Sequence, residues 1–149
     1  MATIRLPADF RDFLKLLHSH RVEYLLVGGY AVCYHGYYLT TANMNLWIAD
    51  HRQNAAKMVR LIREFGFDVP ELSEALFLQK GRIIRMGVEP VRIEVLTEIS
   101  GCEFAECYSQ KVEAMLDGVP VKIIGLADLI KNKLRSGRLK DLDDARKLS

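Results

Sequence analysis

Long apolar runs are missing from this sequence of 149 residues. The longest dense apolar stretch, residues 24–34, is far shorter than the roughly 18 residues that a membrane span needs, so we expect no membrane association. Residues 1–7 carry an early charge and no apolar core, which is not the pattern of a signal peptide. Proline and glycine number only 4 and 10 and follow no period. This excludes a collagenous or low-complexity chain.

Cysteine is also scarce, with three residues at positions 33, 102 and 107. An odd count without a signal peptide favours a reducing compartment, so we predict a cytoplasmic protein. Cys102 and Cys107 are five residues apart, a poor spacing for a metal site, and the four histidines do not cluster with them. Zinc is therefore not expected.

The charge balance lacks a strong excess of either sign, with 21 basic and 19 acidic residues and a net charge of +2. This balance does not by itself indicate nucleic-acid binding. Hydrophobic residues make up 50% and charged residues 27%, as in ordinary soluble domains, and the length predicts one domain over residues 1–149. Basic residues gather in 131–140 and acids follow at once, which we interpret as a solvated helix pair.

Hydrophobic periodicity predicts a mixed β-sheet with helices packed on it, an α/β or α+β domain. Helices are expected to begin near Pro7, to cover residues 30–35 and 55–65, and to close the chain at 126–134 and 139–148. Residues 70–80 stay ambiguous between helix and irregular structure. Strands are expected at 23–27, 44–48, 82–86, 91–96, 112–116 and 119–124. Residues 87–90 are expected to join the third and fourth strands, and Asp117-Gly118 to form a hairpin turn.

Three places could carry chemistry. Gly28-Gly29 stands between a strand and a helix, where glycine lets a phosphate approach the backbone, although such a pair is often only a tight turn. Asn43 and Asn45 alternate along a strand and share a face, so they either hold a ligand or make hydrogen bonds at the strand end. Glu94 shares a strand face with Arg92, and alternation leaves open whether that face meets water or a site.

These residues resemble a known family. The run from Leu26 to Val32, then His35-Gly36-Tyr37, then residues 41–47, is similar to the minimal nucleotidyltransferase domains of the DNA polymerase β superfamily. The tail, residues 128–133 and 137–144, also resembles this family, and most of all its bacterial toxin-type, abortive-infection-related branch. The resemblance covers nearly the whole chain and implies a nucleotidyltransferase-like fold.

The resemblance implies an activity as well. The family transfers a nucleoside monophosphate from a nucleoside triphosphate to a hydroxyl, here of RNA or a partner protein, with Mg²⁺ held by an Asp-x-Asp pair and a third carboxylate. Those positions fall on Asn43, Asn45 and Glu94. Tyr38-Leu39 stand where the family often has Pro-Arg. By the same resemblance Gly28 and Gly29 would contact the triphosphate, and Lys133 and Lys140 a phosphate or the acceptor, unless they are exposed helix lysines.

The departure at Asn43 and Asn45 removes two negative charges from a site meant for two dications, because asparagine keeps the shape of aspartate and loses its charge. Since phosphoryl transfer depends on positioning and electrostatics, we predict little or no transfer activity, whether the enzyme was deliberately inactivated or is a natural pseudoenzyme. Either origin fits. Tyr30 and Trp47 are possible base-stacking residues but are more typical of a core.

Three functional hypotheses follow. The first is an impaired nucleotidyltransferase. The second is a non-catalytic module that binds nucleotide without Mg²⁺ or pairs with a protein in a toxin–antitoxin or defence system, and the third is a structural partner with an apolar patch and no cleft. The acceptor, the preferred base and the oligomeric state cannot be read from the sequence.

Overall fold

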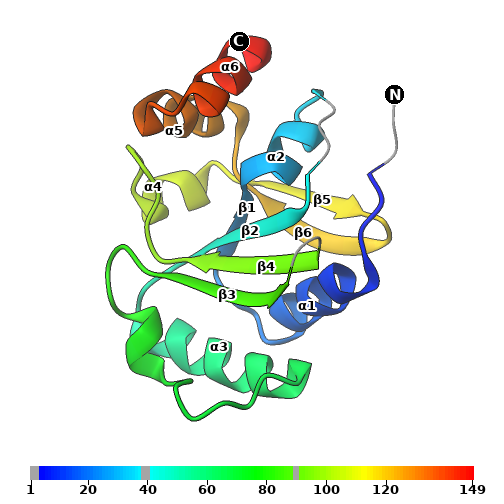
Figure 1. The fold of residues 1–149 in the computed structure, drawn as a ribbon, viewed down its shortest axis with the longest axis vertical. Helices are drawn as coiled ribbons and strands as arrows, with labels where there is room; N and C mark the ends of the chain where they lie inside the picture. The colour runs from blue at the N-terminus through cyan, green and yellow to red at the C-terminus, as the bar shows by residue number, and fades with distance from the viewer. Residues whose placement is uncertain (1–3, 38–40, 89–90) are drawn as a thin grey trace.

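The computed structural model describes residues 4–37, 41–88 and 91–149. Tyr38-Leu39, the departure from the family's Pro-Arg, lies outside the described residues. The elements follow in chain order (Figure 1): α1 Ala8–Ser19, β1 Tyr24–Val27, α2 Gly28–Tyr34, β2 Asn43–Ile48, α3 Arg52–Phe65, the short 3₁₀ helix η1 Glu74–Phe77, β3 Ile83–Val88, β4 Val91–Leu96, α4 Phe104–Ser109, β5 Val112–Leu116, β6 Val119–Ile123, α5 Leu126–Ser136 and α6 Leu139–Leu148.

All six strands form one mixed sheet in the order β3-β4-β2-β1-β6-β5. The β1–β2, β3–β4 and β5–β6 pairs are antiparallel, whereas β2–β4 and β1–β6 are parallel. The predicted mixed sheet with helices packed on it is therefore confirmed. Because β2 runs against β1, the beginning of β2 lies beside the end of β1, where α2 begins.

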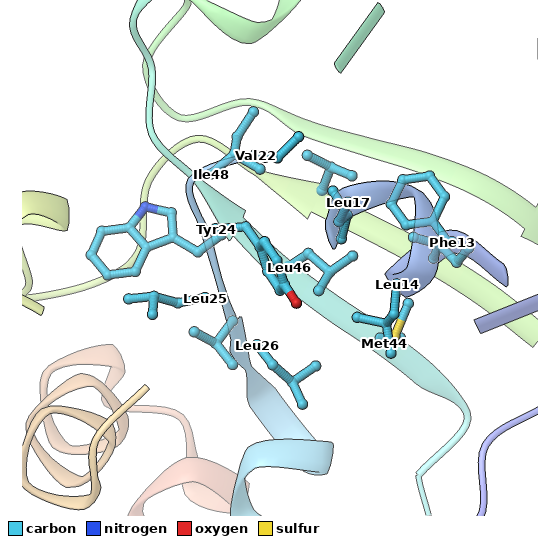
Figure 2. Packing of buried hydrophobic residues seen from close by; sticks show 14 of the residues in the cluster. Phe13, Leu14, Leu17, Val22, Tyr24, Leu25, Leu26, Met44, Leu46 and Ile48 are labelled. Carbon is cyan, nitrogen blue, oxygen red and sulfur yellow. The ribbon is translucent and has the colours of Figure 1, made fainter. Parts of the chain in front are cut away.

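The two faces of β2 have different surroundings. Met44 and Leu46 are fully buried and point toward Phe13 and Leu14 of α1 (Figure 2). On the other face, the Trp47 indole packs edge-on against Phe104 of α4, with ring centroids 5.1 Å apart. The alternation predicted for this strand is thus confirmed, and it directs Asn43 and Asn45 to the face that carries α4.

Buried polar contacts fix α3 beside the beginning of β1. The amide of Asn54 is fully buried, and its Nδ2 donates to the carbonyl oxygens of Ala49 at 2.8 Å and Glu23 at 3.0 Å. Its Oδ1 accepts from the backbone N–H of Glu23 at 2.9 Å. Every polar atom of this side chain has a partner, so the buried amide stabilises the end of the sheet opposite α2.

Several element boundaries differ from the sequence-based prediction. The helix expected at 30–35 begins at Gly28, and β3 continues through Gly87 and Val88, which were expected in the turn. The ambiguous segment 70–80 contains only η1. Helix α4 was not predicted, although Phe104, Cys107 and Tyr108 follow helical spacing. The hairpin turn is confirmed, because Asp117 and Gly118 both have positive φ, at 48° and 80°.

Within the ranges that the structure describes, no helix combines the length and the apolar character needed to cross a bilayer.

Candidate functional site

The glycine pair lies where β1 gives way to α2. Gly28 has φ +70°, a left-handed conformation that glycine adopts without strain. A Cβ atom there would stand 2.6 Å from Asn45 Nδ2, and a Cβ on Gly29 would stand 2.6 Å from Thr41 Oγ1. The absence of side chains at Gly28 and Gly29 therefore lets the beginning of β2 approach this turn closely.

Asn45, Glu94 and Val27 lie in one row across the sheet. Asn45 pairs with Val27 on one side and with Glu94 on the other, and Asn43 pairs with Arg92. The structure thus brings together the three positions that the sequence placed at the site, from strands about fifty residues apart in the chain. The Oδ1 atoms of Asn43 and Asn45 are buried and have no hydrogen-bond partner among the described residues.

A cleft of about 380 Å³ lies over this row and has two walls. One wall is the sheet with the glycine turn, and the other is the α5–α6 pair. The lining residues are Gly28, Gly29, Thr41, Ala42, Asn43, Asn45, Glu94, Lys133, Arg138, Lys140 and Asp141. All seven site residues expected from the sequence therefore line one cleft, which opposes the hypothesis of a structural partner without a cleft.

The two lysines have different environments. Lys133 is buried, and its Nζ lies 3.0 Å from Asp141 Oδ1 and 3.3 Å from Asp144 Oδ2, so it is not an exposed helix lysine. Lys140 is exposed and pairs with Asp144 at 3.3 Å. The region predicted as a solvated helix pair therefore contains a buried ion cluster that joins α5 to α6.

Glu94 does not present a free carboxylate. The side chain is 14% exposed, and its Oε2 accepts from Arg85 Nε at 2.8 Å and lies 3.8 Å from Arg92 Nε. Arg85 stands opposite Glu94 in the β3–β4 pair, so both side chains lie on the same face of the sheet. The sequence-based reasoning missed Arg85, Arg138 and Asp141, although the basic run 131–140 followed by acids indicated the last two.

The donor set does not fit a divalent cation. Of the three positions that the resemblance assigns to the metal, Asn43 and Asn45 contribute neutral oxygens, and the Glu94 carboxylate already neutralises guanidinium groups. Mg²⁺ requires hard anionic oxygens to offset the loss of its water shell. Among the residues that the structure describes, no group of three or more histidine, cysteine, aspartate or glutamate side chains is placed to hold a metal ion.

Trp47 and Tyr30 are core residues, 2% and 6% exposed. Tyr30 packs edge-on against Phe10 with ring centroids 5.8 Å apart. Neither ring lines the cleft, so the expectation that they belong to the core is confirmed. Burial raises the pKa of the Cys107 thiol to about 12, so this cysteine is protonated and is a poor nucleophile or metal ligand.

No protein-family model matches this sequence, and no curated protein matches it significantly. Solved structures do match its fold. A crystal structure of a candidate nucleotidyltransferase from Thermotoga maritima superposes with a TM-score of 0.61 at 13% identity, over 93% of this chain and 88% of that one. An antigenic nucleotidyltransferase-like protein from Paracoccidioides brasiliensis gives 0.52 at 16% identity, over 96% and 75%. The fold is therefore nucleotidyltransferase-like.

Proposed function

We propose that this protein is a catalytically impaired member of the nucleotidyltransferase fold that binds a nucleoside triphosphate in the cleft without a metal ion. The observation that carries the proposal is the convergence of Gly28, Gly29, Asn43, Asn45 and Glu94 on one cleft in which Arg85 already neutralises the Glu94 carboxylate. A parent enzyme with aspartate at positions 43 and 45 would transfer a nucleoside monophosphate with Mg²⁺. With asparagine there, transfer is lost and binding is retained.

The charges around the cleft favour an anionic ligand. The charged lining residues and their ion partners comprise five cations, Arg85, Arg92, Lys133, Arg138 and Lys140, and three carboxylates, Glu94, Asp141 and Asp144, for a local net charge of +2. Aspartates at positions 43 and 45 would bring this sum to zero. The two asparagines therefore shift the cleft from one that admits cations to one that attracts a polyphosphate.

Two further features suit a nucleotide. Gly28 and Gly29 are partly exposed and line the cleft, so a phosphate group can reach the backbone of the glycine turn. Asn43 and Asn45 line the cleft, and their side-chain amides can hydrogen-bond to hydroxyl or amino groups of a nucleoside. The cleft thus offers cations for phosphates and acceptors for the nucleoside.

Calorimetry with ATP and GTP tests the binding. We expect the wild-type affinity to change less than about twofold between Mg²⁺ and a chelator, because the site provides its own positive charge. A strong metal requirement would contradict metal-free binding.

Restoration of the carboxylates tests the catalytic part. We expect the wild type to label no acceptor with α-³²P nucleotides, and N43D/N45D to show Mg²⁺-dependent labelling of RNA or protein. Transfer by the wild type at the rate of this variant would contradict impairment. The variant Q53E, which changes an exposed amide on α3 to a carboxylate outside the cleft, serves as the control.

A second candidate is a partner module of a toxin–antitoxin or defence pair, because α5 and α6 expose Leu134 at 53%, Leu139 at 87% and Leu142 at 38%. Light scattering of the chain co-expressed with proteins encoded beside it tests this function. A stable complex that L139S disrupts would support it, and a monomer with every such protein would contradict it.

A further inference from the structure

The side chain of Arg85 extends the row of site residues to the edge of the sheet. Arg85 pairs with Glu94 across β3–β4, Glu94 pairs with Asn45 across β4–β2, and Asn45 pairs with Val27 across β2–β1. Side chains opposite each other in neighbouring strands lie on the same face. The guanidinium therefore stands beside the carboxylate that the resemblance assigns to the metal.

The contact between Arg85 and Glu94 leaves most of the guanidinium available. Its Nε donates to Glu94 Oε2 at 2.8 Å, and its terminal nitrogens make no hydrogen bond or ion pair with the described residues. A guanidinium has five N–H donors in a planar fork, and the side chain is 53% exposed. Glu94 thus orients a cation whose remaining donors can bind a second anion.

We propose that Arg85, which stands beside the cleft in contact with its lining residue Glu94, takes the place of a metal ion: held by Glu94, its guanidinium binds a phosphate group of a nucleoside triphosphate directly. The inference rests on the proposed function and adds the group that makes metal-free binding possible. A guanidinium matches two phosphate oxygens at once, and its charge does not depend on pH in the physiological range. Glu94 accordingly serves as a positioning residue for Arg85.

Calorimetry in a chelator, with ATP and with tripolyphosphate as probes, tests the proposal. We expect R85Q to weaken both probes at least about tenfold and R85K to fall between R85Q and the wild type, because lysine keeps the charge but not the planar fork. The matched control is R63Q. The Arg63 side chain is also half-exposed, at 52%, and its Nε lies 3.2 Å from Asp68 Oδ1. Arg63 belongs to α3, which lies away from α5 and α6 (Figure 1).

The failures of the two proposals are distinguishable. If the wild type binds ATP in the chelator and R85Q binds it with an affinity within twofold of the wild type, the role of Arg85 is overturned. The proposed function then remains intact. Wild-type protein that binds neither probe in the chelator overturns the proposed function as well. Equal losses in R85Q and R63Q also overturn the inference, because they would reflect general charge. Thermal denaturation verifies that each variant folds.

A second measurement uses Mn²⁺ alone, without nucleotide. If Arg85 occupies Glu94 in place of a metal ion, its removal in the N43D/N45D background frees a third carboxylate. We expect N43D/N45D/R85Q to bind Mn²⁺ at least about fivefold more tightly than N43D/N45D, as measured by electron paramagnetic resonance of free Mn²⁺. Equal affinities, or no binding by either variant, would contradict the proposal.

Discussion

Asparagine at positions 43 and 45 preserves the shape of the site and makes its local charge more positive. Asparagine and aspartate have nearly the same shape, so both side chains occupy the same positions on β2 without a change in the backbone. The substitution changes which partner each side-chain oxygen favours. A neutral amide oxygen accepts hydrogen bonds from N–H or O–H donors, whereas a carboxylate oxygen also coordinates a divalent cation. Consistent with this change, the buried Oδ1 atoms of Asn43 and Asn45 have no hydrogen-bond partner in the part of the chain that the structure describes.

Gly28 is expected to be more sensitive to substitution than a glycine of similar backbone conformation elsewhere. A positive φ costs an alanine about 1–2 kcal/mol at either place. G28A also forces a methyl group toward the Asn45 amide, for which overpacking costs a further 1–3 kcal/mol or so. The control is G118A, where φ is +80° and nothing lies within 4 Å of the added Cβ. Urea denaturation that gives equal losses for both variants would contradict close packing of Asn45 on the turn.

Part of the site could be predicted from single residues, because alternation places Asn43 and Asn45 on one face and the apolar positions between them in the core. The partner of Glu94 could not. The expected turn at 87–90 would have paired Met86 with Val91 and Arg85 with Arg92. The observed register pairs Val88 with Val91 and Arg85 with Glu94. This difference in register therefore decides which side chain faces the Glu94 carboxylate.

At the scale of elements, most helices and strands followed from apolar spacing, whereas α4 and the order of the strands did not. Helix α4 has six residues, too few for a clear period. The parallel pairing of β2 with β4 joins segments separated by α3, η1 and β3, and no local pattern encodes it. The convergence of Asn45 and Glu94 thus depends on long-range packing.

The joining of α5 to α6 is expected to depend on pH through Asp141. Burial opposes the ionised form of this side chain, but the hydrogen bonds from Ser136 and Lys133 and the charges of Lys133 and Arg138 outweigh it, so the pKa lies below the usual 3.8. A lowered pKa in the folded state stabilises the protein above the unfolded pKa, and this stabilisation is lost as the pH falls through the folded pKa. D141N should therefore lower the free energy of unfolding at pH 7 by about 1–3 kcal/mol.

The difference between D141N and the wild type should shrink below pH 3.8, as urea denaturation across pH 2.5–7 would measure. Asp143 provides the comparison, because its carboxylate also pairs with basic side chains but lies on the exposed face of α6. We expect D143N to change the free energy of unfolding far less. Equal losses in D141N and D143N at pH 7 would contradict the role of the buried cluster.

At the scale of the whole molecule, the cleft lies between the sheet and the α5–α6 pair. The pair is anchored to the rest of the chain by Leu129, which is buried in the core, by Asn132 Nδ2, 3.0 Å from the carbonyl oxygen of Ser100, and by the Arg135 side chain against Gly101. Lys147 Nζ also lies 4.6 Å from the centre of the Tyr37 ring. A ligand that contacts the glycine turn and Lys140 together adds a bridge between the sheet and this helix pair.

A triphosphate should therefore stabilise the entire fold and protect α5 and α6 from hydrogen exchange. At a concentration of 100 Kd, binding to the folded state alone contributes about 2.7 kcal/mol. For a chain of this size, this corresponds to an increase in Tm of about 5–10 °C. We expect differential scanning fluorimetry to give this increase in a chelator, with a smaller one for the nucleoside, which lacks the phosphates that the cations attract. An increase in Tm that requires Mg²⁺ would contradict metal-free binding. Hydrogen-exchange protection confined to the sheet would show that the ligand does not bridge the sheet and the α5–α6 pair.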